Sequence, residues 1–124
     1  SVEDMLFVLF NVVTLNQGSV YNSSNGRFTA PVGGRYLFIA TLRFNPYDGT
    51  DYVWSRLCKN GTAVRYGSLF DADEGNTKEY AASVLHAIVD CSANDYFNIQ
   101  VYAYDGAVLH SENNGNEFSG HLIG

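Results

Sequence analysis

A cluster of oxygen-bearing side chains lies between two apolar segments, at residues 71 to 76. Asp71, Asp73 and Glu74 supply carboxylates, and Gly75 allows the chain to bend sharply beside them. Calcium takes about six to eight oxygen ligands, so a short loop of this kind is a candidate Ca²⁺ site. The loop is not an EF-hand, because the closing bidentate glutamate of that motif is absent. We name Asp71, Asp73 and Glu74 as candidate metal ligands, with a solvated acidic loop as the alternative.

Two further polar loops have the composition of a binding surface. The segments Asn45–Asp51 and Asp105–Glu117 mix tyrosine, asparagine, aspartate and serine. Loops on a rigid scaffold are where binding residues concentrate, and these residue types suit carbohydrate hydroxyls or polar protein surfaces. The candidate ligand-binding residues are Tyr47, Asp48, Asp51, His110, Asn113 and Asn114.

No catalytic motif accompanies these polar residues. The three histidines, His86, His110 and His121, are scattered, and none has a nucleophile or a metal ligand close to it in sequence. The chain contains no G-x-S-x-G, no H-E-x-x-H and no phosphate-binding G-x-x-x-x-G-K motif. We therefore predict a protein that binds rather than an enzyme.

The two cysteines are predicted to be free thiols. Cys91 alternates with Val89, so its side chain is expected to face the core, whereas Cys58 shares a strand face with Trp54 and Arg56. A disulfide needs Cβ atoms about 3.5–4.5 Å apart, which opposite facing disfavours.

Two triplets match the acceptor pattern for N-glycosylation, Asn22-Ser23-Ser24 and Asn60-Gly61-Thr62. Asn60-Gly61 is also the best hairpin turn in the sequence, because both residues tolerate positive φ. The second triplet therefore has a structural explanation of its own.

Composition predicts one domain, residues 1–124, with many short strands. Apolar residues make up 46% of the chain and charged residues 16%, and there are 9 Tyr, 8 Phe and 12 Gly. The net charge of −6 argues against a nucleic-acid partner, which calls for basic patches. No apolar run approaches the roughly 18 residues of a membrane span, so membrane insertion is not expected.

Alternating apolar residues and turn signals predict an all-β chain of about eight to ten strands. The longest, Arg35–Phe44, is apolar on both faces, which predicts burial on both sides. The other predicted strands are Met5–Val13, Tyr21, Arg27–Thr29, Tyr52–Lys59, Thr62–Leu69, Tyr80–Cys91, Tyr96–Tyr104 and Phe118–Ile123.

A spaced signature runs through the first third of the chain. It comprises Phe10, Asn16, Tyr21, Phe28, Gly34, Tyr36 and Phe38. With the segments NGRFTAPVGGRYLF, KNGT and the closing FSGHLIG, this signature resembles the complement C1q globular domain family, relatives of the tumour necrosis factor fold. Two departures are visible. Ala40 stands where the family signature usually has one more aromatic residue. Only nine residues precede Phe10, so the family's first strand is expected to be missing, shortened, or supplied by SVEDMLF in an unusual way.

The resemblance implies a two-sheet jelly-roll sandwich that assembles as a homotrimer. A physical argument points the same way, because one small sandwich is not expected to bury so many Tyr and Phe side chains. On this argument the trimer core is predicted to contain Tyr36, Phe38, Tyr102 and Tyr104.

The resemblance also implies a secreted, extracellular recognition head that binds carbohydrate or protein ligands, as in innate pattern recognition. Some members of the family bind Ca²⁺ near the position of Asp73. The alternative is a structural module that trimerises an upstream stalk and has no ligand of its own.

Overall fold

The computed structural model describes residues 6–7, 20–44, 52–71, 81–103 and 116–124, and these form nine strands and no helix. This confirms the predicted all-β class, and most predicted strands agree with the observed ones to within one or two residues. The strands are β1 (Leu6–Phe7), β2 (Tyr21–Asn22), β3 (Arg27–Thr29), β4 (Gly34–Phe44), β5 (Tyr52–Lys59), β6 (Thr62–Asp71), β7 (Ala81–Cys91), β8 (Tyr96–Ala103) and β9 (Glu117–Leu122).

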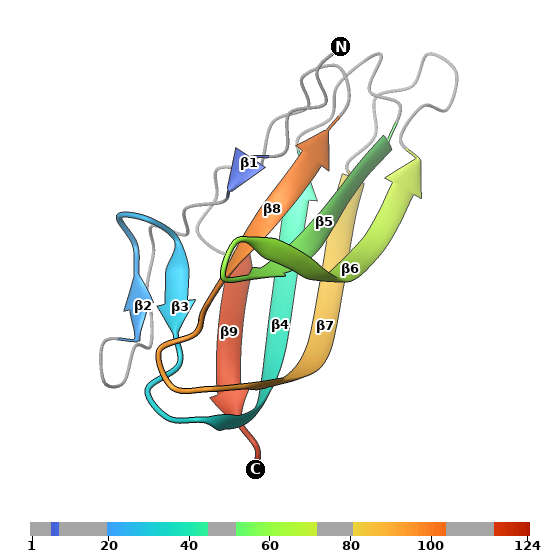
Figure 1. The fold of residues 1–124 in the computed structure, drawn as a ribbon. Helices are drawn as coiled ribbons and strands as arrows, with labels where there is room; N and C mark the ends of the chain where they lie inside the picture. Colours follow the sequence, from blue (N-terminus) through green and yellow to red (C-terminus); the bar gives the residue numbers. More distant parts are fainter. Residues whose placement is uncertain (1–5, 8–19, 45–51, 72–80, 104–115) are drawn as a thin grey trace.

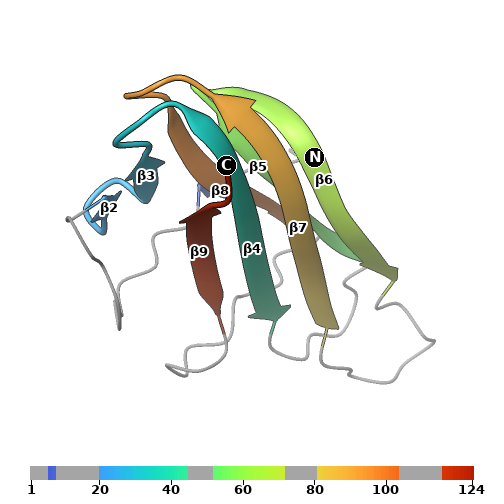
Figure 2. The same cartoon turned by 90° about the horizontal axis from the view of Figure 1, so that it is seen from below.

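The strands form two antiparallel sheets that pack face to face as a jelly-roll sandwich (Figures 1 and 2). Sheet A has the order β2-β3-β8-β5-β6, and β1 also pairs with β8. Sheet B has the order β7-β4-β9, so β4 is its central strand. Neighbours within a sheet are mostly distant in sequence, which is typical of jelly rolls.

The first predicted strand, Met5–Val13, is described only in part. Leu6 lies opposite Val101 and Phe7 opposite Gln100, which places β1 beside β8 in sheet A. The remaining residues of that predicted strand lie outside the described part of the chain. A shortened first strand therefore stays a prediction.

The core lies between the sheets and is centred on aromatic rings. Phe38 is fully buried, and its ring centroid lies 4.3 Å from that of Phe97 and 5.3 Å from that of Phe28. Period-two alternation supplies the other core side chains from both sheets. They are Ala30, Tyr36, Ala40, Leu42, Leu57, Leu85, Ala87, Val89, Ile99 and Val101.

A buried hydroxyl pair joins the sheets near β6. Ser55 Oγ and Ser83 Oγ are 2.7 Å apart, and Ser83 Oγ donates to the Ser68 carbonyl at 2.6 Å, so neither hydroxyl is left unpaired. Gly67 makes room for the pair, since a Cβ there would lie 2.5 Å from Ser55 Oγ. A register shift between Trp54 and Arg56 accompanies this packing.

Two turns at one end of sheet A are hydrogen-bonded to each other. The predicted Asn60-Gly61 hairpin turn is confirmed, with φ values of 51° and 88°. Asn60 Nδ2 donates to Asp95 Oδ1 at 3.0 Å, and Asp95 Oδ2 accepts from the Ser92 amide at 2.9 Å. These hydrogen bonds lower the pKa of Asp95, and the bond from Asn60 has the largest effect. Their contribution to stability is therefore present at neutral pH and is lost as the pH falls through that lowered pKa.

Candidate functional site

The two faces of β4 have different environments, although both are apolar. On one face Tyr36, Phe38 and Leu42 are buried against sheet A. On the other face Leu37 and Ile39 are only half-buried. The predicted burial on both sides is thus met on one side only within a single chain. The second side of this central strand is the candidate site.

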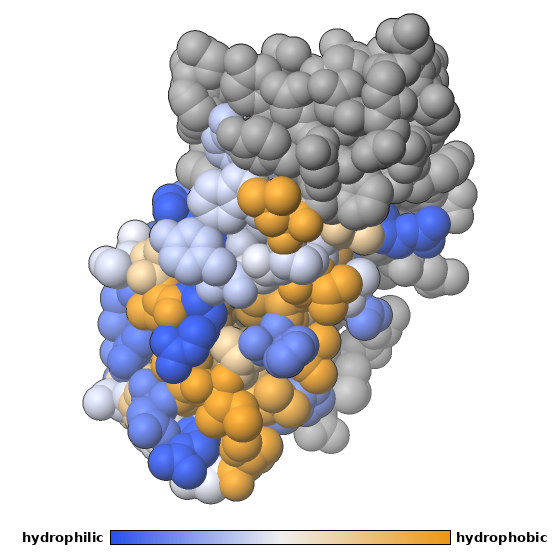
Figure 3. Space-filling view, turned by 90° about the vertical axis from the view of Figure 1, so that its right-hand side faces the viewer, coloured by the Kyte–Doolittle hydropathy of each residue, from blue (hydrophilic) through white to orange (hydrophobic). Residues whose placement is uncertain are grey.

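Apolar side chains of β7 extend this open side of sheet B. Ile88 lies opposite Leu37 and is 51% exposed. Val84 is 46% exposed and lies opposite Thr41, on the same side of the sheet. We call Leu37, Ile39, Val84 and Ile88 the apolar face. Figure 3 looks at the molecule from the side that carries β6 and β7, and apolar side chains gather over its lower part.

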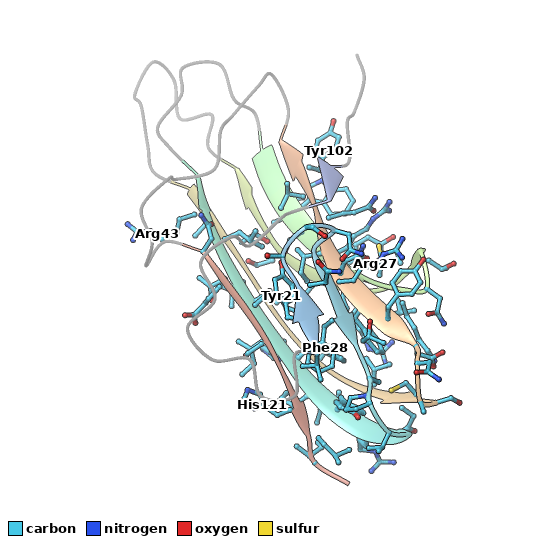
Figure 4. All side chains as sticks on the ribbon, turned by 90° about the vertical axis from the view of Figure 1, so that its left-hand side faces the viewer. Tyr21, Arg27, Phe28, Arg43, Tyr102 and His121 are labelled. Carbon is cyan, nitrogen blue, oxygen red and sulfur yellow. The ribbon has the colours of Figure 1, made fainter. Side chains whose placement is uncertain are left out.

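Polar residues border the apolar face and also interrupt it. His86 is exposed and lies opposite Ile39 on β7, between Val84 and Ile88, and His121 lies opposite Leu37 on β9. At one end Arg35 Nε and Asp90 Oδ1 form an exposed ion pair of 2.9 Å, a type that contributes little stability. Figure 4 shows His121 on the outer side of sheet B. A mainly apolar patch with polar neighbours is the usual anatomy of a protein–protein interface.

Three of the four residues predicted for the trimer core are buried within the single chain. Tyr36 and Phe38 are 2% and 0% exposed inside a single chain, and Tyr102 is 6% exposed. The sandwich buries these rings without a second subunit: Tyr36 and Phe38 lie between the two sheets, and Tyr102 packs against Trp54 on the outer side of sheet A. Their assignment to a subunit interface stays a prediction, and Tyr104 lies outside the described residues. The odd-numbered residues of β4, Leu37 and Ile39, are the ones that another subunit can reach.

The other predicted site residues lie mostly in loops outside the described part of the chain. This holds for the candidate ligand-binding residues Tyr47, Asp48, Asp51, His110, Asn113 and Asn114. Of the candidate metal ligands, Asp71 ends β6 opposite Tyr52, whereas Asp73 and Glu74 are not described. Among the described residues no three His, Cys, Asp or Glu side chains gather as a metal site. The Ca²⁺ site stays a prediction.

Both cysteines are free, as predicted. Cys58 is fully buried on the outer side of sheet A, where its Sγ donates to Gln100 Oε1 at 3.4 Å. Cys91 is half-buried and packs against the core. Burial raises the pKa of both thiols, and the nearby carboxylates of Asp95 and Asp90 raise that of Cys91 further.

We expect two thiols to react with Ellman's reagent in guanidinium, and fewer in the native protein. The thiolate is the reactive form, so the raised pKa values should make native labelling slow and faster at higher pH. Cys91 should react before Cys58, because it is less buried. The variants Cys91→Ser and Cys58→Ser show which cysteine gives the faster and which the slower labelling reaction. A denatured count of zero thiols would contradict the free-cysteine structure.

Comparison with known proteins now decides the family. The family model for the C1q domain matches residues 1–123. The chain belongs to the C1q domain family. Its fold is similar to that of the globular domain of the zebrafish complement 1qA protein, with a TM-score of 0.60 and 17% sequence identity. That match covers 91% of this chain and 80% of the zebrafish chain. Among the described residues, no helix long and apolar enough to cross a bilayer is found.

Proposed function

We propose that this C1q domain is a non-catalytic, secreted recognition head that works as a homotrimer and binds carbohydrate or protein ligands. The observation that carries the proposal is the apolar face of sheet B. Its residues on β7 are exposed in the single chain, its residues on the central strand β4 are half-buried, and polar residues lie beside them. Secretion and a role in innate pattern recognition are part of the proposal, and their basis is membership of the C1q domain family.

A second copy of the chain is the occupant that fits this face best. The strand at its centre is apolar on both sides, and such strands normally have both sides covered. The ion pair of Arg35 and Asp90 lies at one end of the face, Glu117 lies opposite Thr41 beside its other end, and His86 is the one titratable side chain within it among the described residues. In an oligomer with closed symmetry each copy covers the apolar residues of its neighbours. Membership of the C1q family makes three the expected number of subunits.

Ligand recognition is assigned to the loops that join the strands. Segments 45–51 and 105–117 keep the candidate residues named from the sequence, and a trimer presents each of them three times. Three weak sites on one rigid assembly gain avidity against a repetitive surface. The structural alternative is a trimerisation module for a stalk with no ligand of its own, and such a module would need the apolar face but not the loop residues.

Two measurements test the proposal in order. Multi-angle light scattering at micromolar concentration should give about three times 13.7 kDa. A monomer under those conditions would overturn the homotrimer. A glycan array and a pull-down with the trimer then separate the two functions. Binding that depends on Tyr47, Asp48 or His110 supports a recognition head, and a trimer without any ligand supports the structural module.

Calcium is proposed as a ligand of the 71–74 segment. Binding to the native state stabilises it by about 2.7 kcal/mol at a hundredfold excess over Kd. Millimolar Ca²⁺ should therefore raise the Tm by several degrees, and Asp73→Asn should reduce that gain. Mg²⁺ should do less, because it dehydrates reluctantly and demands octahedral geometry. Equal shifts with both ions, or no change with EDTA, would leave a solvated acidic loop as the correct interpretation.

Of the two glycosylation triplets, only Asn22 is expected to carry a glycan when the protein is made in a secretory host. Asn22 is exposed, and the hydrogen bond from Ser24 Oγ at 2.6 Å engages its amide oxygen rather than its amide nitrogen. The Asn60 amide nitrogen instead donates to Asp95 inside the joined turns. Digestion with peptide N-glycosidase F should shift the mass of the parent but not of Asn22→Gln. A shift that is lost only in Asn60→Gln would reverse the assignment.

A further inference from the structure

Three aromatic rings form a continuous stack on the outer side of sheet A. The Trp54 centroid lies 5.5 Å from that of Tyr102 on β8, and 5.5 Å from that of Tyr66 on β6. The interplanar angles are 30° and 33°, so neighbouring rings are close to parallel. Figure 4 places Tyr102 on the side of the sandwich away from sheet B. We call Tyr102, Trp54 and Tyr66 the aromatic stack.

The aromatic stack runs from a buried ring to an open one. Tyr102 is 6% exposed, whereas Tyr66, on the last strand of the sheet, is 61% exposed. Leu69, opposite Trp54, is 62% exposed and adds an apolar edge. Rigid rings that are already packed lose little entropy on binding, so the open end of this stack is suited to a ligand that has a flat apolar face.

A guanidinium lies in the next row of the same surface. Arg56 lies directly opposite Tyr66 on one side and Gln100 on the other. Its Nε donates to Gln100 Oε1 at 2.7 Å, which holds the side chain in one orientation and leaves other N–H donors for a ligand. No carboxylate among the described residues forms an ion pair with Arg56, although the chain has a net charge of −6.

We propose that this surface binds a carboxylated pyranoside, with the sugar ring against Tyr66 and the carboxylate on Arg56. One face of a pyranose presents C–H groups, which are attracted to the electron-rich face of an aromatic ring. A planar guanidinium matches a carboxylate with paired hydrogen bonds, and it does so better than a lysine would. Uronic acids and sialic acids share this chemistry. A neutral sugar would lack the partner that Arg56 requires.

The proposed site goes beyond the loop-mediated recognition described above and does not depend on it. It lies on sheet A, and the apolar face lies on sheet B, so self-association through sheet B leaves the aromatic stack open. Failure of the trimer therefore leaves this proposal testable in the monomer. Success of the trimer does not establish it.

Trp54 is the only tryptophan in the chain, so intrinsic fluorescence reports directly on the aromatic stack. The purified protein is titrated with trigalacturonate, with N-acetylneuraminic acid and, as the neutral control, with methyl galactopyranoside. We expect a saturable change with at least one acidic sugar and none with the neutral sugar at the same concentration. Raising NaCl from about 0.05 to 0.5 M should weaken the binding, because the charge pair is partly exposed to solvent.

Variants decide whether the response comes from this site. Tyr66→Ala and Arg56→Gln should each weaken binding by about tenfold or more. Arg56→Lys should bind as weakly as Arg56→Gln, because lysine has no planar guanidinium to pair with the carboxylate. Arg43→Gln removes an exposed arginine from the other side of the sandwich and should bind like the parent (Figure 4). Circular dichroism checks that each variant is folded. The proposal is overturned by an equal response to the neutral sugar, by unchanged binding in Tyr66→Ala and Arg56→Lys, by lost binding in Arg43→Gln, or by no response to either acid.

Discussion

Replacing Gly120 by valine is expected to leave little folded protein at 37 °C. Gly120 lies in β9 opposite Phe38, and the rings of Phe38 and Phe28 pack closest to it. A Cβ added at this position would lie 2.7 Å from Phe38 Cε1 and 2.9 Å from Phe28 Cε2. Side-chain carbons in real proteins do not approach this closely, so the rings or the strand must shift.

The rings have no space to shift into. Phe38 is fully buried, with Phe97 on one side at a centroid distance of 4.3 Å and Phe28 at 5.3 Å. Overpacking of this kind costs about 1–3 kcal/mol for a small excess and more for a larger one. Gly120→Ala should therefore lower the Tm by roughly 5–15 °C, and Gly120→Val by more.

Thermal unfolding followed by circular dichroism measures the effect. The matched control is Gly33→Ala, where the added Cβ would meet nothing closer than the Cys91 carbonyl oxygen at 3.4 Å. Its Tm should change by only a few degrees. Equal Tm values for Gly120→Ala and Gly33→Ala would show that β9 packs against the core differently from the structure described above.

The second large effect is expected from Ile88→Glu, which should convert the proposed trimer into a monomer of 13.7 kDa. Ile88 is 51% exposed and lies opposite Leu37 in the apolar face. In the trimer each subunit would bury one unpaired carboxylate, and burying an unpaired charge costs several kcal/mol. Association should weaken by about a thousandfold or more, which corresponds to roughly 4 kcal/mol.

Sedimentation velocity and light scattering measure the mass, and circular dichroism checks the fold. The exposed position of Ile88 predicts an intact monomer rather than an unfolded chain. Leu69→Glu is the matched control, because Leu69 is 62% exposed on sheet A. It should remain trimeric. If Leu69→Glu dissociates while Ile88→Glu does not, the subunits associate through sheet A and the proposed interface is wrong.

Local signals explain why the strands were predictable from the sequence. The period-two pattern and its turns placed β5 at Tyr52–Lys59, and the Asn60-Gly61 pair predicted the hairpin that follows. These properties depend on neighbouring residues only, because alternation and positive φ are local. The opposite environments of Cys58 and Cys91 were predictable for the same reason.

The choice of buried face on β4 was not predictable, because both of its faces are apolar. Alternation separates Tyr36 and Phe38 from Leu37 and Ile39 but does not say which set meets sheet A. The aromatic set fits there because Phe28 and Phe97, distant in sequence, supply rings of matching size and Gly120 leaves room. The half-buried aliphatic set, Leu37 and Ile39, then became part of the candidate interface.

The sequence by itself determined the all-β class, the C1q signature, the main strands and the free thiols. The tertiary structure alone decided which residues share a surface. Tyr66, Trp54 and Tyr102 lie on three strands, and the pairing of β5 with both β6 and β8, including one register shift, brings them together. Register across strands is set by long-range hydrogen bonding and core packing, and no local pattern in the chain encodes it.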